Sequence, residues 1–118
     1  MSRLLDELKN YGADVDGVMD RFMEDEELLE ACLDEYLLED EYSILKKCID
    51  EHRYEDAFEV AHALKGVVGN LGLVPLFEAT CIVVEALRAK DYSDIDNLFN
   101  KASAANDTFV NMYKGLKK

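Results

Sequence analysis

Hydrophobic residues recur along most of this chain at intervals of three and four, the spacing of one face of an α-helix. No stretch alternates polar and apolar residues with period two, so we expect no strand. A single proline and six glycines agree with an all-α chain. The pattern predicts helices over residues 2–10, 15–23, 26–39, 40–51, about 54–71 and about 75–90, and a last helix after Ser93.

The long helices are amphipathic and their connections are short, which predicts an antiparallel up-down four-helix bundle with the two N-terminal helices as a lid. A chain of 118 residues is the size of one domain, so we assign residues 1–118 to a single domain. Ser93 is the expected N-cap of the last helix, because Asp96 follows three residues later. The residues expected to face inward from 26–39 and 40–51 are Leu28, Leu29, Cys32, Leu33, Tyr36, Leu37, Ile44, Leu45, Cys48 and Ile49.

The helix over 54–71 carries the most informative pattern. At about 100° per residue, His62 falls on its solvent-facing side. Gly72 follows the helix where a left-handed conformation suits glycine, and Pro75 suits the first turn of the next helix. The stripe expected to face the core consists of Ala57, Ala61, Leu64, Val68 and Leu71.

The face around His62 has an unusual composition. Glycine inside a helix costs about 1 kcal/mol relative to alanine, so two glycines on one exposed face indicate function rather than stability. They bare the backbone beside the imidazole, where a second protein or a bulky group on the ring could approach. Lys65 adds positive charge where an anion on His62 would sit, which predicts a histidine that carries a phosphoryl group. The neighbours of His62 on this face are Phe58, Glu59, Lys65, Gly66 and Gly69.

The eleven residues from His62 to Gly72, His-Ala-Leu-Lys-Gly-Val-Val-Gly-Asn-Leu-Gly, resemble the His-x-Leu-Lys-Gly-x-x-x-Asn-Leu-Gly signature of histidine phosphotransfer (HPt) domains. Ala61 and the Val84-Glu85 pair also fit the family, and the resemblance covers most of the chain. Gly69 departs from it, because the family usually has alanine or serine there. The resemblance implies that helix 40–51 continues helix 26–39, bent or not, and that the N-terminal helices cover one end of the bundle.

The resemblance also implies the function of a phosphocarrier in a two-component phosphorelay. His62 would accept a phosphoryl group, expected on Nε2, from the aspartate of a receiver domain and pass it to another receiver. The partner would supply Mg²⁺ and most catalytic groups, so this chain is expected to be no enzyme and to hold no cofactor. Lys65 would stabilise the phosphoryl charge. The receiver-docking face would consist of Phe58, Glu59, Gly66, Gly69 and Asn70.

Two of these residues have a second interpretation. Asn70 either makes a polar contact in the docking face or a local hydrogen bond at the helix end. Phe58 is either an exposed hot-spot contact for a receiver or a ring folded over the edge of the core. The sequence leaves both pairs open.

Two rival functions belong to other classes. A helical adaptor that binds receiver or signalling domains without being phosphorylated would keep the same surface but leave His62 idle. A metal- or haem-binding bundle would need several converging ligands, yet His62 and His52 are the only histidines. His52 follows a helix among charged neighbours and is interpreted as a solvated side chain. The chain has no Gly-rich nucleotide loop, so we expect no use of ATP.

The formal charge of −13 is concentrated in residues 1–56, which hold 6 basic and 19 acidic side chains, against 7 of each in 57–118. This charge repels nucleic acid and anionic membranes and solubilises the protein. The three cysteines have no metal-ligand spacing and are expected to be reduced. Without a signal peptide or an apolar run that spans a bilayer, we expect a cytoplasmic monomer. Met1 and the Lys117-Lys118 end favour a complete small protein.

Overall fold

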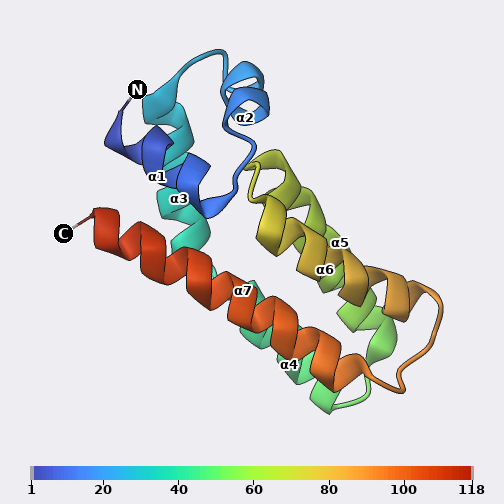
Figure 1. The fold of residues 1–118 in the computed structure, drawn as a ribbon. Helices are drawn as coiled ribbons and strands as arrows, with labels where there is room; N and C mark the ends of the chain where they lie inside the picture. Colours follow the sequence, from blue (N-terminus) through green and yellow to red (C-terminus); the bar gives the residue numbers. More distant parts are fainter. Residues whose placement is uncertain (1, 118) are drawn as a thin grey trace.

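The structure is a computed structural model, which describes residues 2–117. Within this range it is all-helical, so the prediction of an all-α chain without strands is confirmed. No helix of the described part is long and apolar enough to cross a membrane. The helices are α1 (Arg3–Tyr11), α2 (Val15–Arg21), α3 (Glu26–Leu38), α4 (Glu41–Asp50), α5 (Tyr54–Asn70), α6 (Val74–Arg88) and α7 (Ile95–Leu116) (Figure 1).

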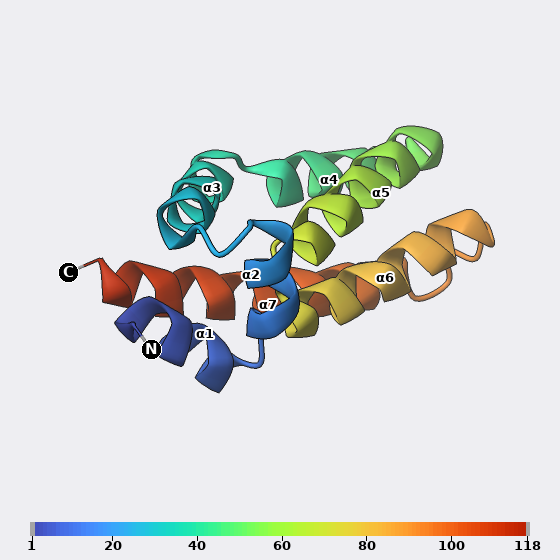
Figure 2. The same cartoon turned by 90° about the horizontal axis from the view of Figure 1, so that it is seen from above.

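The last four helices share one core. Helix α5 packs against α4 and α6, and α7 packs against α6 and α4. Their buried faces follow the 3.6-residue period, which is why each contributes a stripe of apolar side chains. Figure 1 and Figure 2 show α2 beside the connection between α5 and α6, whereas α1 lies alongside the C-terminal half of α7. Core residues with at most 4% exposure include Leu45, Ala61, Leu64, Val68, Val83, Val84, Ala102 and Phe109.

Helices α3 and α4 are separate, so the expectation that one helix continues through both is wrong. Glu39 leaves the helix with an extended backbone (φ −96°, ψ 139°), and Asp40 follows with φ −116° and ψ 57°. Two residues of these helices do not face the core as predicted. Leu28 and Ile44 were both expected to face inward, but they are 44% and 48% exposed.

Tyr42 sets the rotation of α4 instead. Its side chain is buried, and its hydroxyl forms a hydrogen bond of 2.9 Å with Oγ1 of Thr80 in α6. The Thr80 hydroxyl also donates to the Leu76 carbonyl at 2.8 Å, so both buried hydroxyl groups are satisfied.

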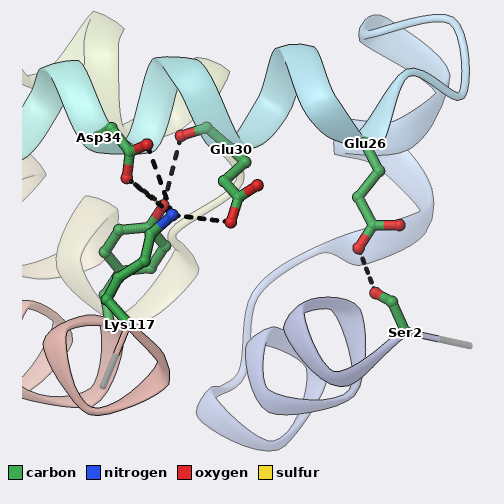
Figure 3. Close-up of polar contacts among 6 residues, drawn as sticks. Ser2, Glu26, Glu30, Asp34 and Lys117 are labelled. Atoms are coloured by element: carbon green, nitrogen blue, oxygen red, sulfur yellow. Dashed lines mark hydrogen bonds and ion pairs between the residues drawn. The ribbon is translucent and has the colours of Figure 1, made fainter.

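Polar contacts fasten α3 and α1 to the rest of the molecule (Figure 3). The Tyr113 hydroxyl of α7 donates to Asp34 Oδ1 of α3 at 2.7 Å, and this bond lowers the pKa of the Asp34 carboxyl. Lys117 Nζ donates to Glu30 Oε1 at 2.7 Å. The Ser2 hydroxyl caps α1 and also donates to Oε1 of Glu26 in the first turn of α3.

The start of α7 differs from the prediction. Its N-cap residue is Asp94, and Ser93 lies in the preceding turn, where its hydroxyl donates to Asp91 Oδ1 at 2.7 Å. The assignment of Ser93 as N-cap is therefore wrong. Pro75 does lie in the first turn of α6, as predicted.

Candidate functional site

Helix α5 carries His62 and has the predicted bounds. All five residues of its predicted core stripe are buried. The helix ends in a Schellman motif: the Gly72 N–H donates to the Gly69 carbonyl at 3.1 Å, and the Leu73 N–H donates to the Val68 carbonyl at 3.0 Å. Gly72 has φ +71°, the left-handed conformation predicted for it. Because the predicted core stripe of α5 is buried, His62 lies on the opposite, solvent-facing side of the helix.

His62 is exposed, and its imidazole stacks on the ring of Phe58, with ring centroids 5.6 Å apart and an interplanar angle of 15°. Phe58 is half-buried against the core. Its ring also lies 5.3 Å from the guanidinium carbon of Arg88. Phe58 therefore packs on the edge of the core and supports one face of the imidazole. No residue within 2–117 forms a hydrogen bond with either imidazole nitrogen, so both are available to a partner.

An open depression of about 470 Å³ lies beside His62. It brings together five residues that the sequence had singled out, and α2 and α6 add one residue each. Glu59 is exposed on α5 but lies outside the depression, as does Phe58. The lining residues are Arg21, His62, Lys65, Gly66, Gly69, Asn70 and Phe77.

The two glycines of this surface differ in their surroundings. A Cβ added to Gly66 would meet no heavy atom within 4 Å beyond the local helix backbone, so the surface there is bare, as predicted. A Cβ added to Gly69 would lie 2.9 Å from Cε1 of Phe77 in α6. Gly69 is therefore required by the packing of Phe77, and the backbone there is covered rather than bare.

Arg21 is the residue of this surface that the sequence analysis missed. It reaches from the last turn of α2 to the end of α5, where Nε donates to the Asn70 carbonyl at 3.1 Å and Nη2 to the Gly69 carbonyl at 3.2 Å. Carbonyls at a helix C-terminus lack intrahelical partners and carry partial negative charge, so a guanidinium fits them well. No local signal in the sequence indicates this contact, because 48 residues separate Arg21 from Gly69.

The charged side chains that line the depression are basic, although the chain is strongly acidic overall. Arg21 and Lys65 line the depression, and no carboxylate does. Asn70 contributes its main-chain carbonyl to Arg21, while its exposed side chain forms no hydrogen bond within residues 2–117. The arrangement can therefore present an accessible imidazole beside two cations, which suits a group that becomes anionic on His62.

The other candidate groups lie elsewhere. His52 is an exposed residue in the turn between α4 and α5, where it stacks on Tyr54. Cys48 is buried, Cys32 and Cys81 are half-buried, and all three are free thiols. Residues 2–117 contain no cluster of three or more histidine, cysteine or acidic side chains arranged to hold a metal ion.

Comparison with known proteins gives no relative: no family model matches the chain, and neither a curated protein nor a solved structure is significantly similar to it.

Proposed function

We propose that this chain is an HPt-type phosphocarrier of a two-component phosphorelay, which accepts a phosphoryl group on His62 from one receiver domain and passes it to another. The observation that carries the proposal is the exposed imidazole beside Gly66, where a side chain would meet nothing within 4 Å. Because Gly66 has no side chain, the active site of a partner can approach the α5 backbone closely beside His62. Lys65, three residues from His62, supplies a neighbouring positive charge.

The proposed reaction is an in-line phosphoryl transfer. The lone pair of an imidazole nitrogen attacks the phosphorus of an aspartyl phosphate, the P–N bond forms, and the P–O bond to the aspartate breaks. The bonding electrons return to the carboxylate, and the proton of the imidazole remains on the other ring nitrogen. Such a reaction needs mainly positioning and charge neutralisation, so the receiver would supply Mg²⁺ while this chain supplies the ring, the gap and Lys65.

We also propose how the helices are arranged around the core. The pairwise packing of α4, α5, α6 and α7 supports an antiparallel up-down four-helix bundle. Two contacts at the two ends of α2 support its role in the cap that we propose for α1 and α2: the Asp14 N–H donates to the Gly72 carbonyl at 2.9 Å, and the Arg21 Nε donates to the Asn70 carbonyl. We further propose that residues 1–118 act as one monomeric domain in the cytoplasm, without a cofactor of their own.

Incubation with a phosphorylated receiver domain tests the proposal, with detection of phosphate that is labile in acid and stable in base. His62→Gln should abolish incorporation and change the free energy of unfolding by about 0.5 kcal/mol or less, because the side chain is exposed. His52→Gln is the matched control and should incorporate phosphate like the parent. Phosphate retained in His62→Gln would overturn the site. If the unsubstituted protein binds receiver domains but never incorporates phosphate, it is instead the non-phosphorylated helical adaptor.

A further inference from the structure

A second cavity lies beside the interruption between α3 and α4. It encloses about 460 Å³, within the range of roughly 300–1,000 Å³ that is typical of small-molecule sites. Residues from α3, α4, α5 and α7 line it, together with Glu39 and Asp40 of the interruption itself. None of its lining residues belongs to the depression around His62. The cavity is therefore a separate feature that the proposed phosphotransfer leaves unexplained.

The floor of the cavity is aromatic and apolar. Tyr36, Tyr42 and Leu64 line it, and each is at most 9% exposed. The Tyr36 hydroxyl donates to Asn106 Oδ1 at 2.5 Å, and the Tyr42 hydroxyl pairs with Thr80. Both hydroxyl groups therefore already have partners within the molecule, and the polar atoms of the floor are satisfied. Phenols are uncharged at neutral pH, and burial raises the pKa of both further above it.

Acidic side chains surround this floor. Glu39, Asp40, Glu41 and Asp107 line the cavity, and no lysine, arginine or histidine does. None of these four carboxylates forms an ion pair or a side-chain hydrogen bond with any of residues 2–117. Asp40 is the N-cap residue of α4, but its side chain makes no capping hydrogen bond. Four uncompensated negative charges beside an aromatic floor create a potential that favours a cation.

We propose that this cavity binds a small organic cation, namely a protonated amine attached to an apolar or aromatic body. The ammonium group would face the carboxylates, and the body would rest on the rings of Tyr36 and Tyr42. The occupant would also touch Ala63 and Val67, so it would contact the helix that bears His62 without entering the depression beside that histidine. The proposal does not depend on phosphotransfer.

Titration of the ¹⁵N-labelled protein with phenethylammonium chloride tests this site by NMR. Saturable shifts are expected in the amides of the lining segments, 36–42, 63–67 and 106–110. The charge-reversed analogue 3-phenylpropionate should cause no saturable shift. Shifts of similar size over all acidic surfaces, or equal binding of the anion, would overturn the proposal.

Two variants separate the shape of the cavity from its charge. Asp40→Asn combined with Asp107→Asn keeps the shape and should weaken binding by roughly thirtyfold, since each of the two charges contributes about 1 kcal/mol at contact distance in water and about 1.4 kcal/mol corresponds to a factor of ten. Asp16→Asn with Asp20→Asn removes the same charge from exposed positions on α2 outside the cavity, and should weaken it less than twofold.

Ala63→Phe fills the cavity while all four carboxylates remain, and should abolish saturable binding. Circular dichroism verifies that each variant is folded. Retained binding in a folded Ala63→Phe protein overturns the proposal. If that variant does not fold, the comparison of the two Asp→Asn pairs decides, and equal weakening by both pairs overturns it.

Discussion

Gly66 and Gly69 lie three residues apart on α5, but they are glycines for different physical reasons. At Gly69 the ring of Phe77 occupies the space of a side chain, so tertiary packing explains the residue. At Gly66 that space is open to solvent. A helical glycine costs about 1 kcal/mol relative to alanine, and no contact within the molecule compensates for this at Gly66. We infer that the space is kept for a partner.

Substitution by leucine separates these two roles. Gly66→Leu should leave the protein at least as stable as the parent, because leucine favours helix by up to about 1 kcal/mol, yet it should block phosphoryl transfer from a receiver. Gly69→Leu is the matched control, and should be destabilised because its Cβ would overlap the Phe77 ring. Urea denaturation and transfer rates measured on the same samples test both effects. A Gly66→Leu variant that transfers at the parental rate would show that the gap is incidental.

Lys65 tests the electrostatic part of the proposed function. Two opposite charges about 4 Å apart interact by about 1 kcal/mol in water and about 4 kcal/mol at an effective dielectric of 20, as in a partly desolvated complex. Lys65→Ala should slow transfer by roughly tenfold, which corresponds to about 1.4 kcal/mol. Lys65→Arg should retain most of the rate, and Lys65→Glu should be slower than Lys65→Ala.

Salt distinguishes this explanation from a steric one, because screening weakens only the electrostatic contribution. The difference in transfer rate between the parent and Lys65→Ala should therefore narrow as ionic strength rises. If Lys65→Glu transfers as fast as the parent at low salt, Lys65 is merely a solvated neighbour of His62.

At the level of the helices, Arg21 joins two elements that are distant in sequence. Its guanidinium donates to two carbonyls at the end of α5. At the other end of α2, the Asp14 N–H donates to the Gly72 carbonyl in the turn that follows α5. The last residues of α5 are therefore held from outside as well as by the Schellman motif. This matters for the candidate site, because Arg21 lines the same depression as His62.

Arg21→Gln should loosen α2 more than it destabilises the whole protein. Both hydrogen bonds are exposed, so we expect a loss of about 1 kcal/mol in the free energy of unfolding. Hydrogen exchange should accelerate in Val15–Arg21 before it changes in α6. Lys46→Gln removes one exposed ion pair with Asp50 and, as the control, should lower the free energy of unfolding less than Arg21→Gln does. Unchanged exchange in α2 would contradict the role of Arg21 as a clamp.

Features with a local cause could be predicted from the sequence. The bounds of α5 and the conformation of Gly72 follow from periodicity and from one glycine, and both are confirmed. The hydrophobic pattern predicted separate helices over 26–39 and 40–51, whereas the family resemblance implied one continuous helix. Neither glycine nor proline marks the boundary, so the sequence alone could not decide between a bend and a break. The burial of Tyr42 against α6 decides the rotation of α4, and that contact is tertiary.

The same distinction applies to the candidate site. The positions of His62, Lys65 and Gly66 on one exposed surface follow from helical geometry alone. The reason for Gly69 lies in α6 and the partner of its carbonyl lies in α2, so neither could be read from α5. Residues whose role is set within one or two turns were predictable, and residues whose role depends on a second helix were not.

For the molecule as a whole, we expect the tyrosines with raised pKa values to set the alkaline limit of stability. Burial raises the pKa of Tyr11 to about 12, and it also raises the pKa of Tyr36, Tyr42 and Tyr113. In the unfolded chain these phenols ionise near pH 10. Their contribution to stability is therefore fully present below pH 10 and is lost as pH rises through the folded pKa values. Each phenolate in the unfolded state adds to a charge that is already −13 at pH 7.

Tyr11 differs from the other three in lacking a partner for its hydroxyl. The oxygen is buried and forms no hydrogen bond of normal geometry within residues 2–117, although the nearby Leu76 backbone opposes the rise in its pKa. The ring itself packs against Phe109 at a centroid distance of 5.5 Å. An unsatisfied buried hydroxyl costs about 1–3 kcal/mol, whereas the ring contact would survive in phenylalanine.

Tyr11→Phe should therefore raise the free energy of unfolding at pH 7 by about 1 kcal/mol, whereas Tyr36→Phe should lower it by a similar amount, because Asn106 would lose the hydrogen bond that it accepts. Both variants remove one phenol that ionises more readily in the unfolded chain. Both should thus lose less stability than the parent between pH 10 and pH 12. Urea denaturation at pH 7 and pH 11, followed by circular dichroism, measures the two effects separately. A Tyr11→Phe protein less stable than the parent at pH 7 would show that the hydroxyl has a stabilising partner. If the loss of stability above pH 10 were the same in all three proteins, the alkaline limit would arise from overall charge repulsion rather than from the buried phenols.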